Sequence, residues 1–433
     1  MKRKGWSFGS ILIIVLTLAV VAGCVLMYHT FHSDADVQMR AMKMAGFLND
    51  AIHGVTQPPV AGNVNVTTVT LSPQTPQTPA PQPVPTVAPN QSGEVTLTLA
   101  GLVAFESNVS DSVYNKQTGL CDYQPIFSLL PSANQEDIRI AALSQAMNAQ
   151  EKKYADDNAQ PSAALAVRAA GFDAAVMDAD AVLLKGAQAA MDTADGLYQN
   201  GLCACGLNWG NAGQMQWMEK DGVKIALIAY QEKVSTRAAN TLQSASGQGM
   251  LTADSMEELK AMIADARSRG AQLVIVYYYW QQTNVNKVTD QMRKTALEVT
   301  AAGVDIVAGV GPRRLLPAAW LSTSDENGVS RRALVLYSLG SLLTESREAY
   351  DISGALVHIR VKAQGSGAVA TGLSYTPTYI WKQQIGGQDQ YRVVQSNQAA
   401  PAQMNDAQRG VMSRSLLRTQ ENLHDSLQLI QED

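Results

Sequence analysis

The stretch that decides the fold lies at residues 273–309 and reads LVIVYYYWQQTNVNKVTDQMRKTALEVTAAGVDIVAG. It begins with Leu273–Tyr279, a continuous apolar and aromatic run that is typical of a strand buried on both faces of a sheet. A helix is expected from about Asn286 to Ala301, followed by a second buried strand over Val304–Ala308. A strand, a helix and a strand with short connections predict a right-handed unit with parallel strands. The sequence therefore indicates an α/β fold.

Segments on the N-terminal side of this unit add further elements. Val95–Leu99 alternates between apolar and polar residues, as a half-buried strand does. Val223–Tyr230 has the composition of a buried strand. Asp254 and Glu257 have the spacing of a helix N-cap and its partner, and this helix is expected to end near Ser268.

The ends of the two central strands indicate where a ligand would bind. In open α/β sheets, ligands bind beyond the carboxyl ends of the strands. These ends fall at Tyr279-Trp280-Gln281 and at Val310–Arg314. We expect the two segments to lie near one another on one rim of the sheet.

Composition excludes some classes of protein. The chain has 433 residues, of which 46% are hydrophobic, so it can form one large domain with appended segments. Its net charge of −5 argues against a nucleic-acid-binding protein, which would need a basic face.

The N-terminus has the features of a membrane anchor. The basic cluster Lys2–Lys4 precedes an apolar run within residues 8–28, and residues 1–7 are expected to be cytoplasmic. A helix over this run would span about 26–30 Å, close to the thickness of a bilayer core. Alternatively, Val21–Cys24 is a lipoprotein cleavage box with Cys24 as the lipidated residue. Both hypotheses predict a single attachment to the cell membrane and an extracytoplasmic domain.

The rest of the chain divides by composition. Residues 29–56 are a juxtamembrane segment, and 57–93 are a Pro-, Thr- and Gln-rich linker in which nine of the 16 prolines fall. Such a linker cannot bury a core and should act as an extended spacer. The globular domain is expected over 94–396, and 397–433 form a tail.

The tail has the pattern of an amphipathic helix. It either packs against the domain or binds a partner protein. Its apolar positions are Met412, Leu416, Leu417, Leu423, Leu427 and Ile430.

Three cysteines remain outside the anchor, at Cys121, Cys203 and Cys205. An odd number permits at most one disulfide within the domain of one chain, from Cys121 to one of the others. The alternative is that all three are small packing residues. A Cys-x-Cys pair without a nearby His or third Cys is a poor zinc site.

Several short motifs have a common resemblance. They are Gly171-Phe172-Asp173 with Gly186, the run Leu273–Trp280, the segment Ala302–Gly309 with Pro312, and Tyr337-Ser338-Leu339-Gly340. Together they resemble the CapA/PgsA family, which is linked to poly-γ-glutamate capsule synthesis and has a calcineurin-like metallophosphoesterase fold. The resemblance covers about residues 95–395. It implies a metallophosphoesterase-like layered sandwich.

The positions at which that family carries metal-binding and acid/base residues hold other residue types here. Gly101 stands where the family has a metal-binding Asp, and Ser144 stands where it has a Glu. Ala179-Asp180-Ala181 replaces Asn-Asn-His, Tyr279–Thr283 replaces His-Trp-Gly-x-Glu, and Gly309–Arg313 replaces Gly-His-His-Pro-His.

The sequence therefore predicts no metal site, no cofactor and no catalytic residue. A two-metal phosphoesterase needs several His, Asp and Asn ligands around ions about 3.5–4 Å apart. None of the five His residues falls at a strand end near the rim. They are His29, His32, His53, His358 and His424.

A set of polar and aromatic residues remains at the expected rim. It could bind an anionic polymer or a glycan, with Arg contacting carboxylate or phosphate and aromatic rings stacking on sugars. Alternatively, the aromatic residues fill the core of the central strand, and the arginines pair with carboxylates such as Asp178 or Asp180. The set comprises Asp178, Asp180, Lys185, Tyr279, Trp280, Arg313 and Arg314.

The function expected from the resemblance is that of a membrane-anchored, extracytoplasmic component of capsule or cell-envelope polymer synthesis. We expect it to be structural or ligand-binding, with capsule-synthesis membrane proteins as partners. One alternative is an active hydrolase that uses remnant acids such as Asp180 and Glu106. Another is an envelope adaptor or sensor that binds its partner through the tail helix.

Overall fold

The computed structural model describes residues 93–133, 137–148, 158–244, 255–282, 285–324, 330–365 and 367–428. Several predicted segments lie outside these residues, namely the anchor over 8–28, the lipoprotein box at Cys24, the juxtamembrane segment and the linker up to residue 92. Within the described part of the chain, none of the helices combines the length and the apolar character needed to cross a bilayer.

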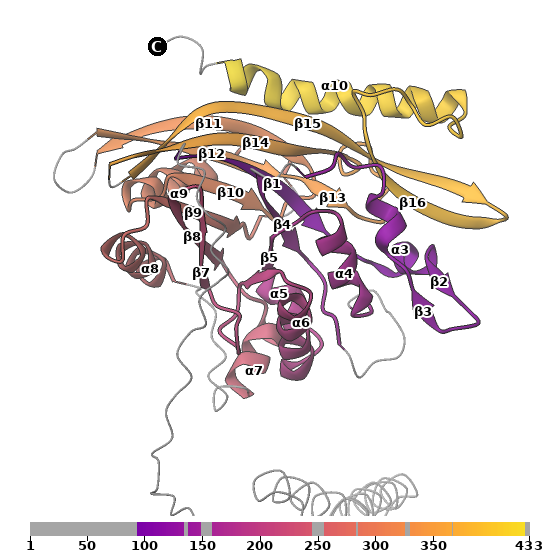
Figure 1. Cartoon of the computed structure of the whole chain (residues 1–433), viewed down its shortest axis with the longest axis horizontal. Coiled ribbons are helices and arrows are strands. Elements are labelled where there is room, and N and C mark those ends of the chain that lie inside the picture. Colours follow the sequence, from indigo (N-terminus) through magenta and orange to yellow (C-terminus); the bar gives the residue numbers. More distant parts are fainter. Residues whose placement is uncertain are drawn as a thin grey trace, which may run out of the picture. The chain divides into compact units, whose positions relative to one another are not determined.

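Two mixed sheets face each other and carry helices on their outer sides (Figure 1). The strand order in the first sheet is β16-β15-β14-β1-β4-β5-β6, with β13 beside β1; in the second it is β11-β12-β10-β9-β8-β7. Helices α4 and α6 cover the first sheet, while α8 and α9 cover the second. The structure is therefore an α/β layered sandwich.

The first sheet contains β1 (Glu94–Val103), β4 (Asp137–Leu143), β5 (Ala174–Met177), β6 (Cys203–Cys205), β13 (Ser341–Leu343), β14 (Ser353–Gln364), β15 (Gly367–Ile385) and β16 (Gln388–Gln395). The second contains β7 (Met215–Lys220), β8 (Val223–Gln231), β9 (Leu273–Tyr279), β10 (Ile306–Val310), β11 (Leu315–Ser324) and β12 (Ser330–Leu339). A small hairpin joins β2 (Tyr114–Asn115) to β3 (Leu120–Cys121).

The helices are α3 (Ser107–Asp111), α4 (Ser162–Ala169), α5 (Ala179–Leu183), α6 (Ala187–Gln199), α7 (Thr236–Ser244), α8 (Met256–Ser268), α9 (Asp290–Ala301) and α10 (Asp406–Gln428), with one 3-10 turn, η1 (Gln124–Phe127).

The unbroken apolar run of β9 has a direct structural cause, because the strand is covered on both faces. Tyr277 and Tyr279 point into the core between the two sheets, whereas Tyr278 and Trp280 pack toward the outer helices. The Tyr277 hydroxyl donates to the backbone oxygen of Ile140 at 3.0 Å, across the sandwich. These tyrosines therefore fill the core and also join the sheets by hydrogen bonds.

The predicted strand–helix–strand unit is present, with shifted ends. Strands β9 and β10 pair in parallel, as expected. Helix α9 starts at Asp290 rather than Asn286, because the Thr289 side chain accepts the Met292 backbone N–H at 3.2 Å and so caps the helix there. The second strand begins at Ile306, two residues later than predicted, and continues to Val310.

Helix α8 ends at Ser268, as expected, but the predicted N-cap was wrong by one residue. Ser255, with extended backbone angles, accepts the Glu258 N–H at 3.2 Å. Asp254 lies outside the described residues. Ser and Asp are about equally good N-caps, so residue type alone could not choose between adjacent positions.

The tail helix α10 lies along β11, β14 and β15 (Figure 1). Its buried face contains Met412, Ser415, Thr419 and Leu423, while Leu417 is exposed. Packing against the domain therefore accounts for the amphipathic pattern, and binding of a partner by this helix stays an untested prediction.

The three cysteines are free thiols in the structure, so the predicted disulfide alternative was wrong and the packing alternative holds. Cys121 and Cys205 are buried in different cores. Cys203 is partly buried beside the core that holds Cys205.

Candidate functional site

A cavity of about 600 Å³ opens at the carboxyl ends of the parallel strands. Asp178 and Asp180 follow β5, Tyr279 and Trp280 close β9, and the two arginines follow β10. The chain reversals after these strands bring all of these side chains to one edge. The lining includes Asp178, Asp180, Tyr279, Trp280, Arg313 and Arg314, but not Lys185.

The two aromatic residues cannot offer a ring face to a sugar. Tyr279 and Trp280 are only 2% and 3% exposed. The Tyr279 hydroxyl donates to the Val176 backbone oxygen at 2.7 Å, and the Trp280 indole N–H donates to that of Tyr337 at 2.8 Å. The expected stacking role was therefore wrong for these residues, and the core-filling alternative describes them.

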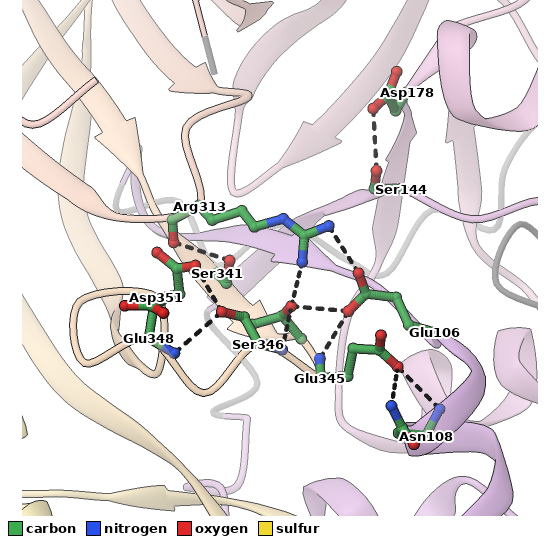
Figure 2. Close-up of polar contacts among 11 residues, drawn as sticks. Glu106, Asn108, Ser144, Asp178, Arg313, Ser341, Glu345, Ser346, Glu348 and Asp351 are labelled. Atoms are coloured by element: carbon green, nitrogen blue, oxygen red, sulfur yellow. Dashed lines mark hydrogen bonds and ion pairs between the residues drawn. The ribbon is translucent and has the colours of Figure 1, made fainter. Parts of the chain in front are cut away.

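Arg313 pairs with a carboxylate that the sequence had not assigned to it. Its guanidinium lies 2.7 Å from Glu106 and donates to the Thr344 hydroxyl at 2.6 Å (Figure 2). Glu106 also accepts the Thr344 hydroxyl at 2.8 Å and the Glu345 backbone N–H at 2.7 Å. The suggested pairing of Arg313 with Asp178 or Asp180 was therefore wrong.

These contacts also occupy Glu106, one of the acids in the hydrolase alternative. Both of its carboxylate oxygens accept hydrogen bonds from Arg313, Thr344 or Glu345. Glu106 therefore joins the segment after β1 to the segments after β10 and β13, which supply these donors.

Arg314 also has protein partners. It donates a short hydrogen bond to the Asn286 side chain. Its guanidinium carbon lies 5.2 Å from the centre of the Tyr350 ring, within the range of a cation–π contact. Arg418 of α10 lies 5.4 Å from the same ring, so the tail helix reaches a neighbour of the cavity wall.

Asp178 serves as the N-cap of α5. Its Oδ1 accepts the backbone N–H groups of Asp180 and Ala181, at 3.1 and 3.3 Å, and its Oδ2 accepts the Ser144 hydroxyl at 3.1 Å (Figure 2). Burial raises the pKa of Asp178 to about 6, and the nearby charge of Asp180 adds to the rise. Asp180 accepts the Ser235 backbone N–H at 2.7 Å, which ties α5 to the loop after β8.

Gly101 stands where the family that this sequence resembles has a metal-binding Asp. In this structure the position has no room for any side chain. A Cβ atom on Gly101 would lie 2.1 Å from the Gly340 backbone oxygen. The Leu102 N–H donates to that same oxygen at 2.9 Å. Gly340, with a φ of +64°, is the point at which the chain leaves β12 in the second sheet and enters β13 beside β1. The sheet crossing therefore fills the space that the Asp would need.

The remaining residues do not fit a two-metal centre. Among the described residues, no three His, Cys, Asp or Glu side chains are placed to share an ion. His358 lies within β14 and bonds the hydroxyls of Thr98 and Thr376, each at 2.9 Å. The donor set that phosphoester hydrolysis by two metals requires is thus not present in this part of the chain.

Some cavity residues were not predicted from the sequence, because they lie outside the strand–helix–strand unit of residues 273–309. Thr344 and Asp351 follow β13, and Lys233 follows β8. Lys233 could have been found, since Val223–Tyr230 was a predicted strand and ligands bind beyond strand ends. Strand β13 spans only Ser341–Leu343, which is too short to be seen as a pattern.

Comparison with known proteins gives a family match over most of the domain. A family model described as bacterial capsule synthesis protein, PGA_cap, matches residues 96–346. The PGA biosynthesis protein CapA of Bacillus subtilis (strain 168) is 27% identical over 154 residues, which are 36% of this chain. The match spans only 37% of that relative's length.

Two solved structures are similar to this chain at low sequence identity. The calcineurin-like phosphoesterase YfkN from Bacillus subtilis is 12% identical, with a TM-score of 0.41, and the match covers 78% of this chain and 99% of that one. The Haemophilus influenzae NAD nucleotidase is 11% identical, with a TM-score of 0.41 and coverages of 76% and 63%.

Proposed function

This chain belongs to the bacterial capsule synthesis protein family PGA_cap, and on that basis we propose that it is a non-catalytic component of capsule or other cell-envelope polymer synthesis. The family match begins in β1 and ends just beyond β13, so it includes the whole second sheet, the strands β1, β4, β5, β6 and β13 of the first sheet, and most of the residues that line the cavity. The polymer concerned would be poly-γ-glutamate or a related acidic chain. The cavity is the proposed place of contact.

One observation carries the non-catalytic part of this proposal. The Gly340 oxygen occupies the space at Gly101 where a metal-binding side chain would begin. A side chain would fit at Gly101 only if the segment that crosses between the sheets at Gly340 moved. A single substitution would therefore not be enough to restore the metal ligand. The carboxylate oxygens of Asp178 and Glu106 also accept hydrogen bonds from other groups of the protein.

Genetic complementation tests the role in polymer synthesis. The gene is deleted in its own host, the full chain is restored on a plasmid, and the envelope polymer is quantified by its acid-hydrolysed monomers. We expect loss of polymer on deletion and recovery with the wild-type chain. Unchanged polymer in the deletion strain contradicts the role.

Purified full-length protein tests the non-catalytic part. We expect no hydrolysis of phosphomonoesters, phosphodiesters or γ-glutamyl bonds, with or without added Mn²⁺. Hydrolysis that disappears in Asp180→Asn, and persists in the exposed α9 control Glu298→Gln, would show an active site and defeat this part of the proposal.

We also propose that the N-terminal segment anchors the chain with its domain outside the membrane, from the basic cluster Lys2–Lys4 and the apolar run after it. Protease added to wall-free cells should digest the domain. A triple Lys2→Glu, Arg3→Glu, Lys4→Glu variant should lose the orientation signal and protect part of the population. Full protection of the wild-type domain contradicts this placement.

A further inference from the structure

Beside the cavity, two arginines from different segments contact one exposed aromatic ring. The ring is that of Tyr350, which is 44% exposed and lies in the segment after β13. Its centre lies 5.2 Å from the guanidinium carbon of Arg314, which lines the cavity, and 5.4 Å from that of Arg418 on α10. Neither arginine forms an ion pair with a carboxylate in the described part of the chain.

Two further arginines extend this positive surface. Arg414 lies one helical turn before Arg418 on α10, and Arg347 lies three residues before Tyr350. Burial raises the pKa of Tyr379, and the nearby charges of Arg347 and Arg414 oppose that rise. Both arginines are exposed, and neither forms an ion pair with any residue that the structure describes. We call the four residues the arginine surface: Arg314, Arg347, Arg414 and Arg418.

Four carboxylates lie on the segments that carry these arginines. Glu345 accepts two N–H groups of Asn108, each at 3.0 Å, and is turned toward that residue (Figure 2). Asp351 is only 9% exposed and belongs to the lining of the cavity. Glu348, which also lines the cavity, and Glu421 on α10 are exposed. Two exposed glutamates therefore oppose four arginines, and among the described residues no ion pair joins the two groups.

Other charges near this surface cancel one another or lie farther away. Lys382 lies 2.6 Å from Asp389, and Asp406 in the first turn of α10 is followed three residues later by Arg409. The acids that follow β5 are separated from the segment after β13 by β1 and β4. The excess of positive charge is therefore local to the arginine surface.

We propose that a chain with a carboxylate on each unit binds across Tyr350, from Arg314 beside the cavity to Arg418 on α10. A guanidinium can hold a carboxylate with two N–H donors, so successive units of the chain would pair with the two arginines. Arg347 and Arg414 add to the positive potential that attracts such a chain.

This inference rests on the proposed function and assigns the tail helix a part in it. Helix α10 and Tyr350 lie beyond residues 96–346, so the family match does not account for the arginines that α10 contributes. Like charges one turn apart on a helix, as at Arg414 and Arg418, destabilise it slightly. A bound polyanion would offset that cost.

The test measures the binding of synthetic oligomers to the full chain in neutral detergent micelles. One probe is a decamer of γ-linked glutamate, and the other is the same decamer with its α-carboxylates converted to amides. Isothermal titration should show binding of the acidic decamer only. Its affinity should fall as the salt concentration is raised, because salt screens exposed charges.

Variants locate the contact. Arg314→Gln and Arg418→Gln should each weaken binding about three-fold, and the double variant about ten-fold, as for two exposed charge pairs. Glu421→Gln should strengthen it, because an opposing charge is removed. Arg269→Gln is the matched control and should change nothing. Arg269 also lies against an aromatic ring, 4.8 Å from the centre of Trp217, but it precedes β9 and so lies at the opposite edge of the sheet from the cavity.

The salt dependence separates direct contact from an effect on the packing of α10. If the arginines bind the polymer, the double variant should lose less affinity than wild type when salt is raised, since fewer charges are paired. An unchanged salt dependence together with a lower thermal midpoint would show that the arginines only hold the helix in place, and would overturn the inference.

Other outcomes also contradict it. Equal affinity of wild type and the double variant for the acidic decamer would exclude this surface, and equal binding of the two probes would show that carboxylates are not recognised. Tighter binding of polyphosphate or of anionic lipid vesicles than of the decamer would assign the surface to a phosphate polymer or to a membrane. None of these results alters the polymer measurement in the deletion strain, so failure here is distinguishable from failure of the proposed function.

Discussion

Single positions around the cavity show how this chain departs from the metal chemistry that its family resemblance implies. Gly101 has a backbone oxygen where a side chain would begin, and Asp178 is used as a helix cap rather than left free. Each of these residues has a local structural role that accounts for its type. Both roles can be tested by substitutions that separate packing from charge.

Gly101→Asp should destabilise the fold and should not create a metal site. The new Cβ would lie 2.1 Å from the Gly340 oxygen, so the crossing between the sheets must shift. We expect a loss of about 2–4 kcal/mol in the free energy of unfolding by urea, as for severe overpacking of a core. Gly196→Ala on α6, where a Cβ meets nothing within 4 Å, is the control and should be neutral or slightly stabilising. Wild-type stability together with bound Mn²⁺ in Gly101→Asp would refute this account.

The titration of Asp178 gives a second prediction at this scale. Its pKa rises from 3.8 to about 6 on folding, so the folded state holds the proton more tightly than the unfolded chain does. Stability contributed by this group is therefore present at low pH, falls as the pH rises from about 4 to about 6, and stays lost above that window. Asp178→Asn keeps an oxygen for the cap and removes the charge.

Relative to wild type, this variant should gain about 1–2 kcal/mol between pH 4 and pH 7.5. Urea unfolding at the two pH values measures the gain. A difference between the proteins that does not change with pH would show that the burial of Asp178 carries no energetic cost.

The tail helix α10 is the clearest case at the scale of elements. Its residue Leu423 is 2% exposed in the core between the sheets, whereas Leu417 on the opposite face is 57% exposed. Leu423→Ala should cost about 2–4 kcal/mol of unfolding free energy, and Leu417→Ala less than about 0.5 kcal/mol. Equal effects of the two substitutions would mean that the helix is not docked as described.

Much of the second sheet could be predicted from the sequence, because its central strands are covered on both faces and appear as unbroken apolar runs. Coverage on both faces also means that the sequence pattern does not indicate in which direction each aromatic side chain points. A run without alternation does not tell which of Tyr279 and Trp280 faces the cavity, and both proved to be buried. Strand β13 could not be predicted, since it is short and pairs with the distant β1.

The candidate site could also be predicted only in part. Arg313 follows a predicted strand, so topology alone placed it near the rim. Asp178 was placed there only through the family resemblance of the residues around it. The partners of Arg313 could not be predicted, because Glu106 and Thr344 reach it through contacts between segments 207 and 31 residues apart. Which carboxylate neutralises an arginine depends on tertiary packing that local patterns do not encode.

At the scale of the whole molecule, the sheets are joined at the cavity by the ion pair of Glu106 and Arg313. Glu106 follows β1 of the first sheet, and Arg313 follows β10 of the second. The Glu106 side chain is 13% exposed and that of Arg313 is 44% exposed, so the pair is partly shielded from water. It should contribute more than a surface pair, because the buried carboxylate would otherwise lose its charged donor.

A double-mutant cycle on this pair tests whether it couples the sheets. Arg313→Ala alone should destabilise the protein, since Glu106 keeps its charge without its cationic partner. The same substitution should cost less in a Glu106→Gln background, and the coupling energy should be about 1–2 kcal/mol. The pair of Lys260 and Glu298, 44% exposed on both sides, is the control cycle and should give no more than about 0.5 kcal/mol. If the two cycles give the same small coupling, the Glu106 pair is an ordinary surface contact. The sheets would then be held together at the cavity by the crossing at Gly340 and the tyrosine bonds of β9, without help from charge.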